Sequence, residues 1–149
     1  MSLNTPNKND KIIFFTPDYE SGETRHLVTE GISAGFPSPA EDFMEFRISL
    51  DKTLTSNPEA TFYARVKGNS MIDAGINDKD VLVIDRSLEP RDQKIAVCYI
   101  DGEFTVKRIK LEKDCLYLMP ENPAYQPIKV TTENQFLIWG IVTYVIKKV

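Results

Sequence analysis

The sequence predicts a mostly β fold, in which short antiparallel strands and hairpins form a compact domain behind an extended N-terminal arm. Three observations lead to this prediction. From residue 60 onward, short apolar runs with alternating or continuous hydrophobicity recur between turn residues. Two of these runs are joined by Asp101-Gly102, a dipeptide typical of tight β-hairpins. Nowhere in the sequence does a helical spacing of apolar residues continue over enough residues to support a helical bundle.

Residues 1–42 are expected to be a flexible arm. They hold few apolar residues outside the run Ile-Ile-Phe-Phe at 12–15. The stretch Gly-Ile-Ser-Ala-Gly-Phe-Pro-Ser-Pro at 31–39 contains two glycines and two prolines, which disfavour both a helix and a central strand. We therefore expect this stretch to be extended and exposed, and residues 41–50 to form a short helix after it.

Residues 43–149 are expected to form the domain. In the run 60–67, small or apolar side chains alternate with longer polar ones, as in a half-buried strand. The last strand-like segment, Phe-Leu-Ile-Trp-Gly-Ile-Val-Thr-Tyr-Val-Ile, is rich in β-branched and aromatic residues and predicts a buried strand or strand pair. The strand-like segments after the first lie at residues 80–85, 94–100, 103–111, 115–119 and 136–146.

Length and composition indicate one soluble domain. The chain has 149 residues, of which 42% are apolar, enough to build a core. Its longest uncharged apolar stretch is too short to cross a bilayer as a helix, which needs about 20 residues. The first 30 residues show no signal peptide. We therefore expect a cytoplasmic protein without a membrane association.

Charge and metal-binding residue types argue against several classes of function. The net charge of −4 is divided equally between residues 1–34 and the remainder, so neither part has the basic block that follows a nucleic-acid backbone. Direct, sequence-specific nucleic-acid binding is therefore not expected. A histidine triad or zinc site would have to rest on the single histidine, His26. Cys98 and Cys115 are expected to be reduced, buried thiols. No metal or other cofactor is predicted.

The predicted hairpin determines the position of one lysine. If Asp101-Gly102 is a two-residue turn, side chains on either side of it alternate between two faces. A lysine on an apolar face either extends its amine to solvent, the commoner case, or loses water, which favours the neutral amine. The expected pairs are Ile100 with Glu103, Tyr99 with Phe104, Cys98 with Thr105, Val97 with Val106 and Ala96 with Lys107. Lys107 then shares its face with Thr105, Ile109, Ala96 and Cys98.

Ser70 is the candidate partner of Lys107. It lies in Gly-Asn-Ser-Met, where a predicted strand ends and Gly68 allows a sharp turn. A serine at such a junction can present its hydroxyl as a nucleophile, and a neutral lysine amine can accept the proton. Without a usable histidine, a serine hydrolase made from this sequence needs a Ser–Lys pair. Taken alone, the four residues also fit a serine that caps a turn.

Several segments together resemble the LexA/UmuD-type family of self-cleaving serine peptidases, and its UmuD-like members most. The resemblance extends from about residue 31 to the C-terminus and implies a LexA/UmuD-like compact β domain. UmuD-like proteins more often have Cys-Gly at the cut, whereas Ala-Gly is the LexA form. The similar segments, in the order of the family, are the cleavage site at 34–39, the nucleophile segment at 68–85, the lysine segment at 101–111 and the closing segments at 118–125 and 139–146.

The resemblance implies a role for each matching residue. Ser70 corresponds to the nucleophile and Lys107 to the general base. The bond between Ala34 and Gly35 corresponds to the cleavage site. The backbone amides of Ser70 and Asn69 correspond to the oxyanion hole.

The resemblance also implies a function in the SOS response to DNA damage. It suggests a homodimer whose self-cleavage is stimulated by RecA filaments. The processed form would then serve as an accessory subunit of a UmuC-type, error-prone translesion polymerase.

Three rival functions are weighed against this one. A LexA-like repressor needs a DNA-reading module before the cut, for which residues 1–34 are too few and too polar. A non-cleaving interaction module of the same fold would keep the Ser–Lys pair but leave it idle. A signal peptidase shares the Ser–Lys chemistry but would need a membrane anchor.

Overall fold

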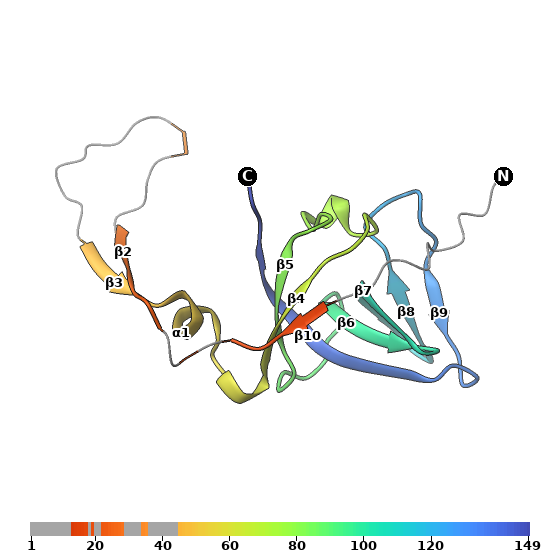
Figure 1. Cartoon of the computed structure of the whole chain (residues 1–149). Coiled ribbons are helices and arrows are strands. Elements are labelled where there is room, and N and C mark those ends of the chain that lie inside the picture. The colour runs from red at the N-terminus through yellow and green to blue at the C-terminus, as the bar shows by residue number, and fades with distance from the viewer. Residues whose placement is uncertain (1–12, 18, 20–21, 29–33, 36–44) are drawn as a thin grey trace. The chain divides into compact units, whose positions relative to one another are not determined.

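The computed structural model describes residues 13–17, 19, 22–28, 34–35 and 45–149 (Figure 1). The chain forms two compact units. The larger unit comprises Met1–Pro17 and Asn57–Val149, and the smaller unit comprises Asp18–Ser56.

The larger unit is built on one antiparallel sheet of eight strands, which confirms the mostly β fold. Each of the six strands predicted from the sequence is present, within two residues of its predicted bounds. Along the sheet the order is β1-β4-β5-β10-β6-β7-β8-β9. The elements are β1 (Ile13–Phe15), the 3₁₀ turn η1 (Pro58–Ala60), β4 (Thr61–Arg65), the 3₁₀ turn η2 (Ile72–Ala74), β5 (Val81–Asp85), β6 (Ile95–Ile100), β7 (Glu103–Glu112), β8 (Cys115–Met119), β9 (Ile128–Val130) and β10 (Phe136–Ile146).

The β6–β7 hairpin has the predicted register. Asp101 and Gly102 both have positive φ, 47° and 86°, as the type I′ turn that suits a two-residue hairpin requires. All five predicted pairs are present, ending with Ala96 opposite Lys107. The turn therefore determines which face of β7 carries Lys107.

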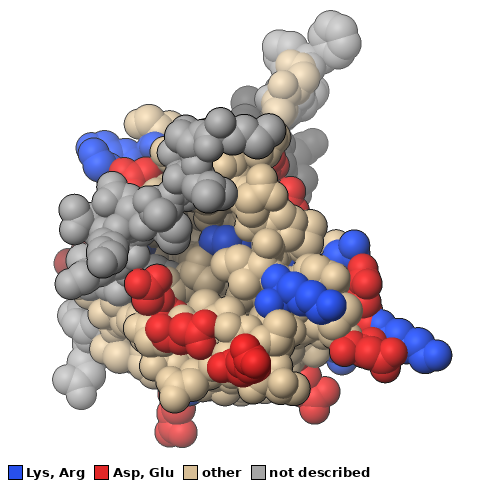
Figure 2. Space-filling model, turned by 90° about the vertical axis from the view of Figure 1, so that its right-hand side faces the viewer, with Lys and Arg blue, Asp and Glu red and all other residues tan. Residues whose placement is uncertain are grey.

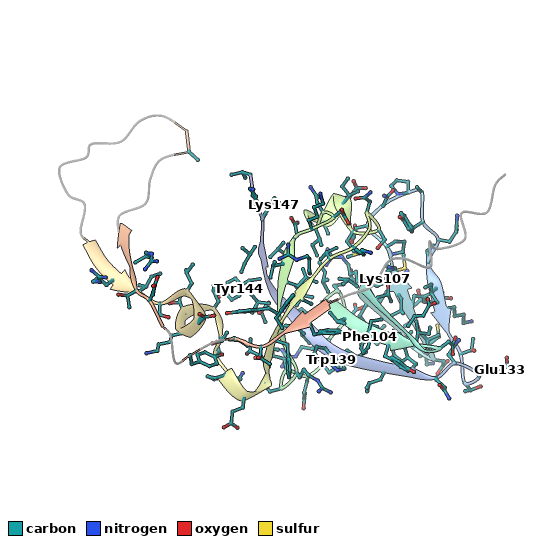
Figure 3. The ribbon with its side chains drawn as sticks, in the orientation of Figure 1. Phe104, Lys107, Glu133, Trp139, Tyr144 and Lys147 are labelled. Carbon is teal, nitrogen blue, oxygen red and sulfur yellow. The ribbon has the colours of Figure 1, made fainter. Side chains whose placement is uncertain are left out.

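The sheet is strongly curved. Phe14 of β1 packs against Phe104 of β7, with ring centroids 5.0 Å apart. Four strands lie between β1 and β7 in the sheet, so a flat sheet with strands about 4.8 Å apart would separate them by about 24 Å. Trp139 of β10 also contacts Phe14, with centroids 4.5 Å apart, and lies near Phe104 in Figure 3. The sheet therefore curves so strongly that side chains of β1, at one edge, contact side chains of β7, the sixth strand in the order.

Two irregularities in β10 help to explain this curvature. Its register shifts between Ile138 and Gly140 against β6, and between Val142 and Tyr144 against β5. Such β-bulges bend a strand and increase its twist. Because β10 lies between β5 and β6, bends in it change the angle between the two halves of the sheet.

Two clusters of buried side chains fill the larger unit. The first joins side chains from β4, β5, β6 and β7, which only a curved sheet can bring together. Burying each large apolar side chain stabilises the fold by roughly 1.5–3 kcal/mol. The first cluster is Ala64, Val66, Met71, Ile76, Leu82, Ile84, Val97 and Val106, and the second is Ala96, Cys98, Ile109, Leu118 and Ile141.

The smaller unit has a two-stranded ribbon where the sequence predicted part of a helix. Strand β2 (Arg25–Val28) pairs antiparallel with β3 (Glu45–Ile48), and α1 (Leu50–Leu54) follows. The predicted helix over 41–50 is therefore wrong for residues 45–48. Their sequence, Glu-Phe-Arg-Ile, alternates polar and apolar residues with the period of a strand. Residues 41–44 lie outside the described part of the chain.

The two units have different limits from the predicted arm, 1–42, and domain, 43–149. Strand β1 pairs with β4 in the large sheet, and residues 45–56 belong to the smaller unit. Most of the stretch 31–39 lies outside the described residues. Which residues behave as a mobile arm therefore stays a prediction.

Two predictions about burial are only partly correct. Along β10 only Gly140 and Ile141 are buried, whereas Leu137 is 52% and Tyr144 49% exposed, because part of this long strand faces solvent. Cys98 is free and buried as predicted, but Cys115, at the start of β8, is free and partly exposed. The side chain of His26 is outside the described part. No helix among the described residues is long and apolar enough to cross a membrane.

Candidate active site

The candidate nucleophile lies on the turn that follows β4. Gly68 has a φ of 95°, and its N–H donates to Asp78 Oδ1 at 2.8 Å, so the chain turns at the predicted glycine. Met71, only 2% exposed, inserts into the first core cluster. Ser70 is held between these two anchors and is half-buried. The turn therefore presents its hydroxyl from a fixed backbone.

The candidate general base lies on β7 and reaches Ser70. Lys107 is only 7% exposed, so its amine does not extend into solvent. Of the two arrangements that the hairpin pattern allows, the structure therefore has the less common, buried one. Its Nζ hydrogen-bonds to Ser70 Oγ at 3.0 Å, Thr105 Oγ1 at 2.7 Å and Val106 O at 3.1 Å. These three partners are uncharged. The structure therefore brings together the two residues proposed as a dyad, although they lie 37 positions apart.

The face of the hairpin around Lys107 excludes water. Ala96, Cys98 and Ile109, which the register predicted on this face, have no exposed surface. Burial raises the pKa of the Cys98 thiol to about 12, and the charge of a protonated Lys107 opposes part of this rise. Surroundings that keep a thiol neutral also disfavour an ammonium group, because both charged forms lose hydration.

We expect Cys98 to react with iodoacetamide only after the protein unfolds. The thiolate is the reactive form, and burial suppresses both its formation and its access to reagent. At about pH 8, the native chain should take up one carbamidomethyl group, on Cys115, and the urea-unfolded chain two. Peptide mapping by mass spectrometry would locate them. Equal labelling of both cysteines in the native chain would contradict the buried environment.

The raised pKa of Cys98 also gives stability a defined pH dependence. Because the folded pKa of about 12 exceeds the ordinary 9.0, the unfolded chain ionises first as pH rises. The contribution of the neutral thiol is complete below about pH 9 and declines between pH 9 and 12. Cys98→Ala should remove this part of the decrease in the free energy of unfolding at alkaline pH. Urea unfolding on both sides of pH 9 would measure it.

The loop between β8 and β9 holds the Ser70 segment from a second side. Glu121 N–H donates to Ser70 O at 2.8 Å, and Asp73 N–H donates to Glu121 O at 2.8 Å. Asn122 Nδ2 donates to Asn69 O at 2.9 Å. Sequence reasoning assigned no chemistry to these loop residues, because spacing does not reveal which loop meets the serine.

A shallow pocket of about 290 Å³ opens beside this loop. Three prolines and a tyrosine give it apolar walls next to polar groups. Its lining residues are Asp73, Pro120, Glu121, Asn122, Pro123, Tyr125 and Pro127.

The predicted cleavage residues lie in the smaller unit. Ala34 and Gly35 are both exposed and form a bend. A Cβ added at Gly35 would meet no atom within 4 Å among the described residues. An exposed, uncrowded peptide bond is the kind that a peptidase can reach.

The charges on the face shown in Figure 2 are mixed. Among the described residues visible there, lysine and arginine side chains form no continuous stripe, and acidic side chains lie between them. Such a mixture does not favour the backbone of a nucleic acid. In the described part of the chain, no three His, Cys, Asp or Glu side chains are grouped as ligands for a metal ion.

Known proteins resemble this chain over most of its length. A model of the family described as Peptidase S24-like matches residues 26–143. Protein ImpA of Escherichia coli is 38% identical over 138 residues, covering 89% of this chain and 90% of ImpA. Protein MucA of Escherichia coli is 44% identical over 115 residues, covering 76% and 77%. LexA repressor 2 of Pseudomonas syringae pv. tomato (strain ATCC BAA-871 / DC3000) is 39% identical over 111 residues, which cover 74% of this chain and 54% of the repressor.

Proposed function

The chain belongs to the Peptidase S24-like family, and on that premise we propose that it is a serine peptidase that cuts its own backbone. The membership bears out the resemblance to LexA/UmuD-type proteins. In this proposal Ser70 is the nucleophile and Lys107 the general base, and the bond that breaks joins Ala34 to Gly35. The observation that carries it is the 3.0 Å contact between Nζ of the buried Lys107 and Oγ of the half-buried Ser70.

The surroundings of Lys107 suit an amine that works as a base. A neutral amine has two N–H bonds and one lone pair. Thr105 Oγ1 and Val106 O can accept N–H bonds of this amine, and its lone pair would take the Ser70 hydroxyl proton. The distance of 3.0 Å is within the range for direct proton transfer. Burial removes water that would otherwise stabilise the ammonium form.

The reaction then runs through an acyl-enzyme. Ser70 Oγ attacks the carbonyl carbon of Ala34 as its proton passes to Lys107. The oxyanion collapses, the C–N bond breaks, and Lys107 returns the proton to the leaving amine of Gly35. Water hydrolyses the remaining ester, with Lys107 accepting the water proton and returning it to Ser70. The products are a 34-residue fragment with a new carboxylate and a chain that begins at Gly35.

Small residues and a covalent tether favour this substrate. Ala34 and Gly35 have little bulk to keep their backbone away from the serine. Because the substrate is tethered to the protein that cuts it, docking can benefit from a high effective concentration without a tight binding site. The slow events are expected to be docking of the segment and the formation of neutral Lys107.

We extend the proposal to a UmuD-like role in the SOS response, supported by membership of the family. The chain would be a cytoplasmic homodimer that RecA filaments on single-stranded DNA induce to cleave. The processed chain would serve as an accessory subunit of a UmuC-type translesion polymerase. RecA would act by promoting docking of the cleavage segment, since the Ser–Lys contact already exists in the intact chain.

Ser70→Ala is expected to abolish formation of the fragment that begins at Gly35. Without the hydroxyl there is no nucleophile, whereas the fold keeps its core because Ser70 is only half-buried. Intact-mass measurement after incubation with RecA filaments would follow the product, with the exposed Ser56→Ala as a matched control. Cleavage at Gly35 by Ser70→Ala would disprove the nucleophile. No cleavage by the native chain, with filaments or at alkaline pH, would support a non-cleaving interaction module.

A further inference from the structure

One loop holds the peptide groups on both sides of Ser70. Glu121 N–H donates to Ser70 O at 2.8 Å, and Asn122 Nδ2 donates to Asn69 O at 2.9 Å. Asn122 Oδ1 accepts the N–H of Ala124 at 3.0 Å. Since only an oxygen can accept that N–H, the Asn122 amide must turn its NH₂ group toward Asn69.

The bond between Asn69 and Ser70 links this contact to the reaction. The peptide group is planar and trans, so its C=O and N–H point in opposite directions. A hydrogen bond that fixes Asn69 O therefore also fixes the direction of the Ser70 N–H. Within the described part of the chain this N–H donates to no acceptor, which leaves it available to a substrate.

We propose that Asn122 is a positioning residue that directs the Ser70 N–H toward the oxyanion. The inference rests on the proposed function, in which negative charge develops on the carbonyl oxygen of Ala34. Preorganised donors stabilise that charge because they do not have to reorient during the reaction. Losing a complete donor of this type costs about 10²–10³-fold in rate, so a misdirected donor should cost about 10- to 100-fold.

Two substitutions separate positioning from an ordinary structural role. Asn122→Asp keeps an oxygen that accepts the Ala124 N–H, and therefore keeps the turn, but removes the donor to Asn69. Asn122→Ala removes both. A role in the turn alone predicts native cleavage for Asn122→Asp and slow cleavage for Asn122→Ala. Positioning predicts that both variants are slow to a similar degree.

The matched control is Asn134→Asp. Asn134 also combines a turn acceptor, for Thr131 N–H, with an amide donor, to Asp101, but it lies in the β9–β10 loop. First-order rates of fragment release by the full chain at alkaline pH would be measured for all variants, with thermal unfolding as a check. We expect the cleavage rate of both Asn122 variants to fall by about 10- to 100-fold, as expected when an oxyanion donor is weakened. Asn134→Asp should cleave at the native rate. Cleavage by Asn122→Asp at the native rate would overturn the proposal.

A second measurement does not depend on docking of the cleavage segment. An alkyl fluorophosphonate phosphonylates a reactive serine, and the phosphoryl oxygen then occupies the oxyanion position. Labelling of Ser70 in Asn122→Asp should be slowed by a similar factor, and labelling at the native rate would refute the role of Asn122. If the native chain is labelled at Ser70 but releases no fragment, self-cleavage fails while Asn122 is still tested. If it is neither labelled nor cleaved, both proposals fail.

Discussion

Replacing Lys107 with alanine is expected to abolish self-cleavage. Nζ lies 3.0 Å from Ser70 Oγ, and in the proposed mechanism it is the group that removes the hydroxyl proton. Without it Ser70 stays a neutral alcohol, which is a weak nucleophile. Loss of such a base, which also reprotonates the leaving amine, should slow the reaction by more than about 10³-fold. After an incubation that processes the native chain fully, the intact mass of Lys107→Ala should show no chain beginning at Gly35.

Two further variants make this result specific. Lys110 lies on the same strand, but its side chain is exposed and pairs with Glu112 at 3.1 Å, so Lys110→Ala should cleave normally. Lys107→Arg keeps the positive charge but cannot lose a proton in a protein, so it should be inactive. An active Lys107→Arg would mean that charge, rather than proton acceptance, is what the site requires.

The same base predicts that cleavage accelerates with pH. The first-order rate of the native chain should rise from about pH 7 to about pH 10, because the neutral fraction of a lysine increases over this range. Circular dichroism at each pH would show that the fold persists. A flat rate profile in folded protein would contradict a lysine base.

Local pattern was sufficient to predict the hairpin that carries Lys107. An Asp-Gly turn with positive φ at both residues fixes the register, and alternation then determines every side chain's face. Both are properties of neighbouring residues, which explains why the five predicted pairs are all correct. The same register and alternation also predicted the apolar neighbours of Lys107.

The contact between Lys107 and Ser70 could not be derived in this way. The hairpin pattern alone favoured a solvent-exposed lysine, since most strand lysines are hydrated. Their proximity depends on the curvature of a sheet in which β5, β10 and β6 lie between β4 and β7. The absence of a usable histidine made Ser70 a candidate partner, and the resemblance to a family then assigned the two residues to one dyad. The role of Asn122 depends on a loop–loop contact that no spacing rule predicts.

Short strands were the main omission in the fold. Strands β1, β2, β3 and β9 contain only three or four residues each, too few for an alternating pattern, even where it is present as in β3, to identify a strand. Their structure depends on partners distant in sequence, as when Phe14 lies opposite Ala64. The helix predicted over 41–50 failed for residues 45–48 for this reason, because pairing with β2 outweighs a weak local preference.

Gly140→Ala is expected to weaken both the fold and the site. A Cβ at this position would lie 2.5 Å from Ile84 Cγ2 and 3.2 Å from Arg86 Cγ. Ile84 is fully buried and its Cγ2 is attached directly to Cβ, so it has little freedom to move away. Overpacking of this kind should lower the free energy of unfolding by about 1–3 kcal/mol, measured by urea denaturation.

The effect on cleavage follows from the position of Gly140 in the bend of β10. Relieving the clash requires β5 and β10 to separate, which changes the curvature that brings the turn after β4 to Lys107. Cleavage should therefore slow even under conditions in which Gly140→Ala is fully folded. Adding Ile84→Leu, which has no methyl group on Cβ, should restore part of both losses, since the clashing atom is gone. Native stability together with a native rate in Gly140→Ala would show that the sheet tolerates a wider spacing here. The contact between Ser70 and Lys107 would then not depend on this bend.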